Sequence, residues 1–201
     1  MASRLGIINL ALQNVGAARV GAVEDSELSV EANQSYDTIR DVELRANAWG
    51  FASKRVNVAA HSVAPAFDFL KAYPLPVDCL RVLFPVRQNL DWRIENHEGA
   101  VSILTNQDSS PLRLRYISRA SEALFDPLFT LMLGCALGWQ IAERVTQSNS
   151  KRDAMRQRYT DIRREARRLN AFERVPDKSP VDEWLTGLQT GQFAGVDWGE
   201  Q

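Results

Sequence analysis

The sequence predicts a mainly α protein, in which a helical bundle of about four helices carries an inserted small antiparallel β-sheet region. Apolar residues recur at helical spacing in stretches 3–16 and 28–49, and again in stretches 127–147 and 150–173. Between these two helical pairs, residues 52–120 contain most of the prolines and several short alternating runs. A chain of 201 residues with 45% hydrophobic content is long enough to bury the core of one such domain.

The first helix is expected over residues 3–16. Ser3 is a suitable N-cap, Gly16 a suitable end, and the apolar positions between them step by three or four. Those positions are Leu5, Ile8, Leu12 and Val15. The spacing predicts an amphipathic helix of three to four turns.

The second helix is expected over residues 28–49, with Asp25 or Ser26 as its cap. Its apolar positions keep helical spacing: Ala32, Tyr36, Ile39, Val42 and Ala46. The two aromatics around the glycine in Trp49-Gly50-Phe51 are more typical of a helix end anchored in a core than of a ligand cage.

In residues 52–120 the amino-acid composition changes to one that favours β-strands. Five short runs have the composition or alternation of strands: 55–58, 80–84, 92–95, 100–104 and 112–117. A hairpin turn is expected at about 96–99. Residues 73–76, Tyr-Pro-Leu-Pro, are expected to be extended because a residue before proline avoids the helical region. We predict one small antiparallel sheet here.

The third helix is expected over residues 127–147. Asp126-Pro127 places a capping carboxylate beside a proline that fits the first turn of a helix. Nearly every side of this helix is apolar, so it must lie inside the protein. It is too short, and too interrupted by Gly134, Gly138 and charged residues, for a membrane span.

The fourth helix, residues 150–173, carries most of the positive charge. Residues 151–174 hold nine basic and four acidic residues, a net +5 in a chain of net −1. An arginine stripe flanks the apolar stripe of this helix: Arg152, Arg156, Arg163 and Arg167. The stripe is either a solvated helix face or a docking surface for carboxylates or phosphates, which arginine binds in a bidentate manner.

Residues 1–175 are expected to form a single domain and residues 176–201 an extended C-terminal tail. The tail has a net charge of −4 and no persistent period. Three aromatics within it are candidate partner-binding residues: Trp184, Phe193 and Trp198. The tail either docks on another surface, such as the basic helix of the next subunit, or is a solvated end.

Signatures of catalysis are scarce. The sequence holds no common metal, nucleophile or nucleotide motif, and the two cysteines, Cys79 and Cys135, lack metal-ligand spacing. His97 falls in the expected hairpin turn, where a solvated tip is commoner than a general base. We therefore expect no enzyme activity, no catalytic or metal-binding residues, no cofactor and no membrane partner. No secretion signal begins the sequence, which indicates synthesis in the cytoplasm.

Several segments, in this order, resemble the head-to-tail adaptor of tailed bacteriophages, the tail tubular protein A family. They are Ala11-Leu-Gln-Asn-Val-Gly16, Leu44-Arg-Ala-Asn-Ala-Trp-Gly-Phe-Ala52, Tyr73-Pro-Leu-Pro-Val-Asp-Cys-Leu-Arg-Val82, Leu114-Arg-Tyr-Ile117, Asp126-Pro127 and Ala142-Glu-Arg-Val-Thr-Gln-Ser-Asn-Ser-Lys151. The last of these leads to Tyr159 and Ala166-Arg167. The resemblance covers roughly residues 3–175.

The resemblance implies a structural virion protein made in the host cytoplasm and located at the head-tail junction. Such a protein forms a homo-oligomeric ring, typically dodecameric, that binds the portal protein above. Below, it binds the nozzle, tail tubular protein B, or other tail proteins. The ring lines part of the DNA channel, so the protein lies close to the passing DNA without binding it specifically. Two alternatives stay open: a DNA-binding regulator using the arginine-rich helix, and a virion-associated hydrolase.

Overall fold

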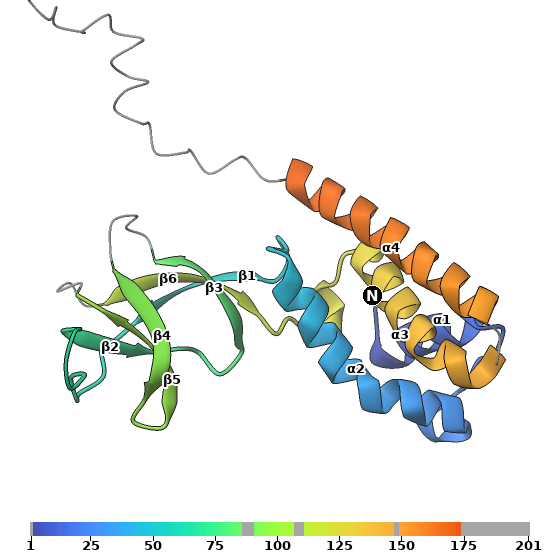
Figure 1. Cartoon of the computed structure of the whole chain (residues 1–201), viewed down its shortest axis with the longest axis horizontal. Helices are drawn as coiled ribbons and strands as arrows, with labels where there is room; N and C mark the ends of the chain where they lie inside the picture. The colour runs from blue at the N-terminus through green and yellow to red at the C-terminus, as the bar shows by residue number, and fades with distance from the viewer. Residues whose placement is uncertain (1, 86–90, 107–110, 147–148, 174–201) are drawn as a thin grey trace, which may run out of the picture.

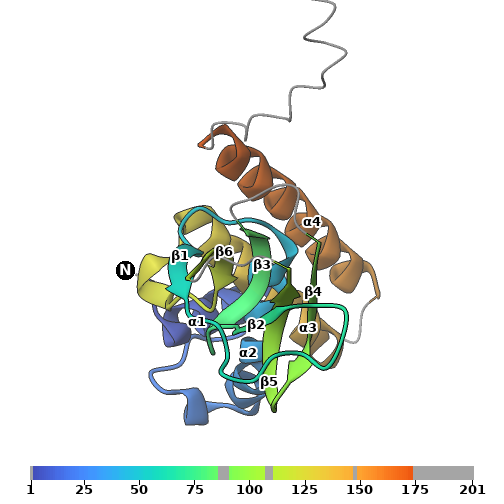
Figure 2. The same cartoon turned by 90° about the vertical axis from the view of Figure 1, so that its left-hand side faces the viewer.

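The computed structural model describes residues 2–85, 91–106, 111–146 and 149–173. Within this part of the chain, four α-helices form a bundle and six strands form two small antiparallel sheets. Figure 1 shows the bundle and the strands beside each other along the long axis, and Figure 2 shows the sheets in front of the bundle. The chain is thus mixed α and β rather than mainly α as predicted, because the insert contributes six strands beside the four helices.

Helix α1 (Arg4–Asn14) begins and ends as the sequence predicts. The Ser3 side chain accepts a hydrogen bond from the Gly6 amide at 3.1 Å, which caps the first turn. Past the last turn, Gly16 has a φ of 81°, a conformation that favours glycine, and the Ala17 amide donates to the Leu12 carbonyl at 2.9 Å. This end turns the chain toward the 3-10 turn η1 (Val23–Asp25).

Helix α2 (Glu27–Ala46) is capped by Ser26, which accepts from the Ser29 amide at 3.1 Å. It ends three residues before the predicted Trp49, because Asn47 adopts an extended conformation. Trp49 then turns into the core, where its indole N–H donates to the Glu43 carbonyl at 2.8 Å. An aromatic anchor at the helix end was predicted, and the structure confirms it.

The strands form two sheets, so the prediction of a single sheet was wrong. One sheet has the order β1 (Ser53–Val58), β6 (Leu112–Ser118), β3 (Cys79–Pro85). The other has the order β2 (Lys71–Pro74), β5 (Ala100–Thr105), β4 (Trp92–His97). Strand β2, predicted only as extended chain, is an edge strand, where its proline is tolerated.

The two sheets share one apolar cluster. Tyr73 and Ile103 of the second sheet pack with Leu112, Leu114 and Tyr116 of the first. Each sheet has apolar residues for one buried face, and stacking the sheets buries both faces at once. This is the physical reason for two sheets in place of one. We call residues 53–118 the β-module.

The β4–β5 hairpin turns where the sequence predicts. His97 pairs with Ala100, and the two residues between them, Glu98 and Gly99, have φ values of 51° and 77°. A two-residue loop with positive φ at both positions matches the right-handed twist of the flanking strands. The turn therefore sets the register of this hairpin.

Helices α3 (Pro127–Thr146) and α4 (Asn149–Phe172) complete the bundle. Asp126 caps α3, accepting from the Leu128 amide at 2.8 Å. Helix α3 packs against α1, α2 and α4, and most of its apolar residues are buried, as predicted for the central helix; Leu128, Leu131 and Trp139 are partly exposed. Among the described residues, no helix is long and apolar enough to cross a membrane.

Candidate protein-interaction surface

The arginine stripe of α4 faces the bundle more than the solvent. Arg152, Arg163 and Arg167 are half-buried, while Arg156 is exposed. The Arg156 guanidinium carbon lies 6.0 Å from the centroid of the Trp139 ring, and that of Arg163 lies 5.6 Å from the Tyr159 ring. These arginines therefore stack on the aromatics that join α3 to α4.

Arg163 also closes a buried polar cluster with Glu43 of α2. The Arg163 Nε lies 3.2 Å from Glu43 Oε2, and the Tyr159 hydroxyl donates to Glu43 Oε1. The Glu43 side chain is only 5% exposed, so its charge depends on these partners. Burial, and next the contact with Glu43, raise the pKa of Tyr159 above the usual tyrosine range. The cluster fastens α4 to α2.

The positive charge that α4 presents to solvent comes mainly from other arginines. Arg156, Arg158, Arg164 and Arg168 are exposed. Arg164 lies 3.7 Å from Asp161, but both side chains are solvated, so this pair contributes little to stability. Helical angles alone did not identify these residues, since three of them lie off the predicted stripe. Docking by the stripe itself stays a prediction.

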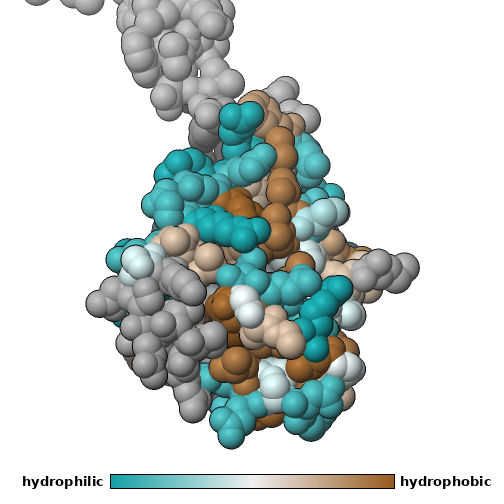
Figure 3. Space-filling model, turned by 90° about the vertical axis from the view of Figure 1, so that its right-hand side faces the viewer, coloured by the Kyte–Doolittle hydropathy of each residue, from teal (hydrophilic) through white to brown (hydrophobic). Residues whose placement is uncertain are grey.

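An apolar groove lies beside the C-terminal half of α4. Its volume is about 250 Å³. It is lined by Trp49, Phe51, Leu124, Asp126, Leu128, Ala166, Leu169, Asn170 and Glu173. Leu124 is 55% exposed and Leu169 is 41% exposed. Figure 3 shows apolar surface in a band along the upper part of the face at the helical end, bordered by hydrophilic side chains.

One wall of the groove is held by Asn170. Its amide nitrogen donates to the Ala48 carbonyl at 3.1 Å, and its side-chain oxygen accepts from the Gly50 amide at 2.9 Å. These bonds tie the end of α4 to the turn after α2. Leu169 keeps the helical spacing of the apolar stripe, and this spacing alone does not reveal the groove. The available signal was its position in the last turn of α4, where fewer neighbouring residues cover an apolar side chain.

The β-module has exposed apolar side chains of its own. They are Val63, Phe67, Leu70, Val77, Ile94 and Val101. His97, predicted as a solvated tip, is half-buried: its Nε2 donates to the Val63 carbonyl at 3.0 Å and its ring centroid lies 5.2 Å from that of His61. The histidine pair thus holds the loop after β1 against the β4–β5 hairpin.

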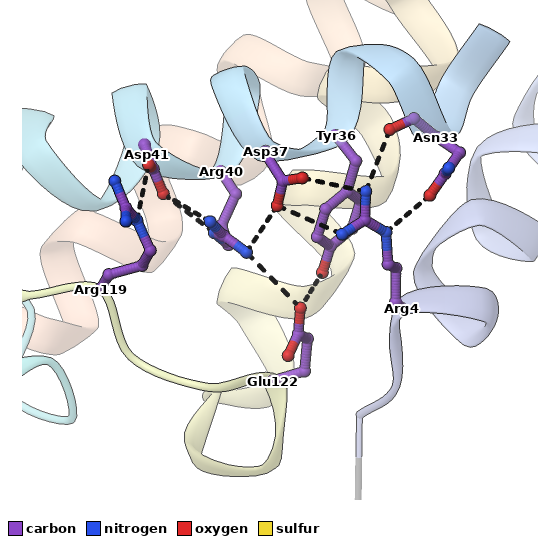
Figure 4. Close-up of polar contacts among 8 residues, drawn as sticks. All are labelled: Arg4, Asn33, Tyr36, Asp37, Arg40, Asp41, Arg119 and Glu122. Carbon is purple, nitrogen blue, oxygen red and sulfur yellow. Dashed lines mark hydrogen bonds and ion pairs between the residues drawn. The ribbon is translucent and has the colours of Figure 1, made fainter. Parts of the chain in front are cut away.

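A polar network joins helices α1 and α2 to Arg119 and Glu122, which lie between β6 and α3 (Figure 4). Arg40 of α2 is 9% exposed and lies within 2.9 Å of carboxylate oxygens of both Asp37 and Asp41. Asp41 in turn accepts from the Nε of Arg119, the residue after β6, at 2.9 Å. On the other side of the network, Tyr36 donates to Glu122 at 3.1 Å.

The α1 end of the same network is equally well paired. Arg4 contacts Asn33 at 2.6 Å and Asp37 at 3.1 Å, and its guanidinium carbon lies 4.5 Å from the Tyr36 ring centroid. Next to Arg119, the Ser118 amide and hydroxyl both bond the Ala52 carbonyl, at 2.8 and 3.0 Å. The Arg4 contacts hold α1 against α2, and the Ser118 bonds tie the end of the β-module to the residue before its first strand.

Three candidate residues from the sequence, Trp184, Phe193 and Trp198, lie outside the described residues, as does the rest of the 176–201 tail. Within the described ranges, no three histidine, cysteine or acidic side chains gather as a metal site would require. Both cysteines are free thiols, and burial, then the Asp78 carboxylate, raises the pKa of Cys79 to about 11.

Comparison with known proteins adds no relative. No protein-family model matches the chain, and no curated protein matches it. The functional argument therefore depends on the surfaces described above and on the resemblance in the sequence.

Proposed function

We propose that this chain is a head-to-tail adaptor of a tailed bacteriophage, a subunit of a ring that joins the portal protein to the tail. The supporting observation is the pairing of two separate exposed apolar surfaces, the α4 groove and the β-module side chains, on one fixed frame. A connector subunit needs different contacts for different neighbours. The polar network that holds Arg119 and Glu122, shortly after β6, would transmit force between the β-module and the bundle.

In this proposal, the bundle contacts the portal or the adjacent subunit, with the exposed arginines of α4 facing acidic side chains. The β-module contacts the nozzle or another tail protein. Charge complementarity of this kind sets orientation and association rate more than affinity, so its loss should be read in the rate at which the subunit joins the portal ring. A channel that lets DNA slide is better served by the rest of the chain, which is net −6 outside residues 151–174, because a strongly basic lumen would hold DNA by counterion release.

The test is the mass of the complex by light scattering, with the full chain alone and after mixing with a portal ring from a short-tailed phage. Binding of a ring of copies, with a typical expectation of twelve, supports the proposal. A charge-reversed variant makes the test more specific: glutamate at Arg158, Arg164 and Arg168 should slow association with the portal ring, followed by light scattering over time, by at least about tenfold. The stripe residue Arg163 is unsuited to this variant because it pairs with Glu43.

A matched control reverses three exposed arginines of the β-module, Arg55, Arg93 and Arg113, with the same change in net charge. Equal losses in both variants would show a general charge effect and would contradict an α4 contact. A chain that ignores the portal ring but binds duplex DNA, with steep salt dependence and a sequence preference, would refute the adaptor and support the DNA-binding alternative.

A further inference from the structure

The α4 groove and the end of the described chain lie at the same place. Glu173, the last described residue, is one of the side chains that line the groove. The C-terminal segment, residues 174–201, therefore leaves α4 at the rim of the groove. Joining two interacting sites through a short linker gives an effective concentration on the order of millimolar.

The groove is open and apolar, and its size suits one large side chain. At about 250 Å³ it is smaller than most pockets for drug-sized ligands, which span about 300–1,000 Å³. Leu124 and Leu169 on its rim are half-exposed, whereas Trp49 is 2% exposed. An aromatic ring placed here would remove the two leucines from water and contact the edge of the buried aromatic cluster around Trp49.

The C-terminal segment supplies such a ring within reach. Trp184 is its first aromatic and lies eleven residues beyond Glu173, a length that spans roughly 36–40 Å when extended. That is ample for the chain to turn back on itself. Phe193 and Trp198 lie farther along and would reach neighbouring subunits more easily than Trp184 does.

Charge favours the same placement. The C-terminal segment holds two basic and five acidic residues, a net −3, whereas α4 holds eight basic and three acidic residues, a net +5. Two of the acidic residues, Asp182 and Glu183, directly precede Trp184. Arg168 is exposed and directly precedes Leu169 of the groove, so it can pair with an acidic side chain next to the docked indole. The groove lining also holds two carboxylates, Asp126 and Glu173, so the acidic pair must lie on the Arg168 side, away from both of them.

We propose that Trp184 docks in the α4 groove of its own chain, with Asp182 and Glu183 facing the exposed arginines of α4. This inference concerns the isolated chain and does not depend on the adaptor assignment. The docked segment would cover the groove until a binding partner displaces it.

Fluorine NMR on the full chain labelled with fluorotryptophan tests the contact from both sides. The five tryptophans give separate reporters, assigned by single substitutions. Trp184→Ala should shift the Trp49 resonance, because Trp49 lines the groove, and the matched control Trp198→Ala should leave it in place. From the other side, Leu169→Asp should shift the Trp184 resonance. Its control, Val42→Asp, changes another exposed apolar residue, 56% exposed and outside the groove.

Tryptic cleavage after Lys178 gives an independent readout. Leu169→Asp should speed this cleavage by about tenfold relative to Val42→Asp, the ratio expected when an open population rises tenfold. Unchanged Trp49 and Trp184 resonances, or equal cleavage rates, would overturn the proposal. A dilution series of about tenfold decides whose groove is filled. Shifts that persist on dilution support docking within one chain. Shifts that vanish on dilution show that the segment of a second copy fills the groove, and this result would overturn the proposal.

Discussion

Removing the carboxylate of Glu43 should destabilise the protein strongly, because it leaves a buried polar cluster without its acceptor. Glu43 Oε1 accepts from the Tyr159 hydroxyl and Oε2 lies 3.2 Å from Arg163 Nε, with the Glu43 side chain 5% exposed. Breaking a buried ion pair from one side costs about 3–5 kcal/mol. The Arg163 side chain is 31% exposed and can partly rehydrate, so we place Glu43→Ala at the lower end, about 3 kcal/mol.

The assay is urea unfolding of the full chain followed by circular dichroism, with the slope checked for two-state behaviour. Glu43→Gln keeps the size of the side chain and one acceptor oxygen, so it should cost less, about 1–2 kcal/mol. Arg164→Ala is the control, since it removes an exposed pair on the same helix and should stay within about 0.5 kcal/mol of the parent chain.

A double-mutant cycle with Tyr159→Phe identifies the cause of the loss. Residues that share one polar cluster should show a coupling energy of at least about 1 kcal/mol. If Glu43→Ala costs no more than Arg164→Ala, or if the two losses simply add, the idea that this cluster fastens α4 to α2 is refuted. The arginine stripe would then be available to bind a partner, as the docking hypothesis from the sequence requires.

Three further outcomes follow from the packing and the ionisable groups. Gly134→Ala should destabilise by about 1–3 kcal/mol in the same urea assay, since the new Cβ would lie 2.9 Å from the Leu10 Cβ; a gain in stability, as helix propensity alone predicts, would contradict the close approach of α1 to α3. The Cys79 pKa of about 11 makes alkylation at pH 8 about a hundredfold slower than for a thiol with the ordinary pKa of 9.0, with the rate rising as pH approaches 11; reaction at the rate of a free cysteine would show that Cys79 is accessible. Burial, and next the bond to Asp78, raises the pKa of Tyr116 to about 12, and Tyr159 shifts in the same direction. Their stabilisation is complete below the ordinary tyrosine pKa of about 10 and is lost above it, by up to about 1.4 kcal/mol per pH unit for each tyrosine; unfolding free energy that stays constant between pH 10 and pH 12 would count against both shifts.

The adaptor proposal and the groove proposal make separate demands on the molecule. The first requires the exposed arginines of α4 to meet a partner, and the second requires only that the chain cover its own groove. Both depend on the C-terminal half of α4. Arg163 of the stripe pairs with Glu43 inside the bundle, whereas the last turns of the helix line an open groove.

Local chemistry in the sequence determined the ends and types of most elements. Ser3, Ser26 and Asp126 were identifiable as caps because a short polar side chain before an apolar period bonds the free amides of the first turn. The hairpin at Glu98-Gly99 was equally local, since positive φ at both positions of a two-residue loop depends on those residues alone. The buried character of α3 followed from apolar residues on all its sides.

Only the tertiary structure decided how these elements meet. The sequence contains strand patterns but not their pairing, so one predicted sheet became two that share the cluster around Ile103. In the sequence, Gly134 served only as an argument against a membrane span, whereas in the structure it allows α1 to approach α3 closely. Arg163 read as a surface charge because its partner, Glu43, is distant in sequence. Long-range partners leave no local pattern, and the fold alone brings them within reach.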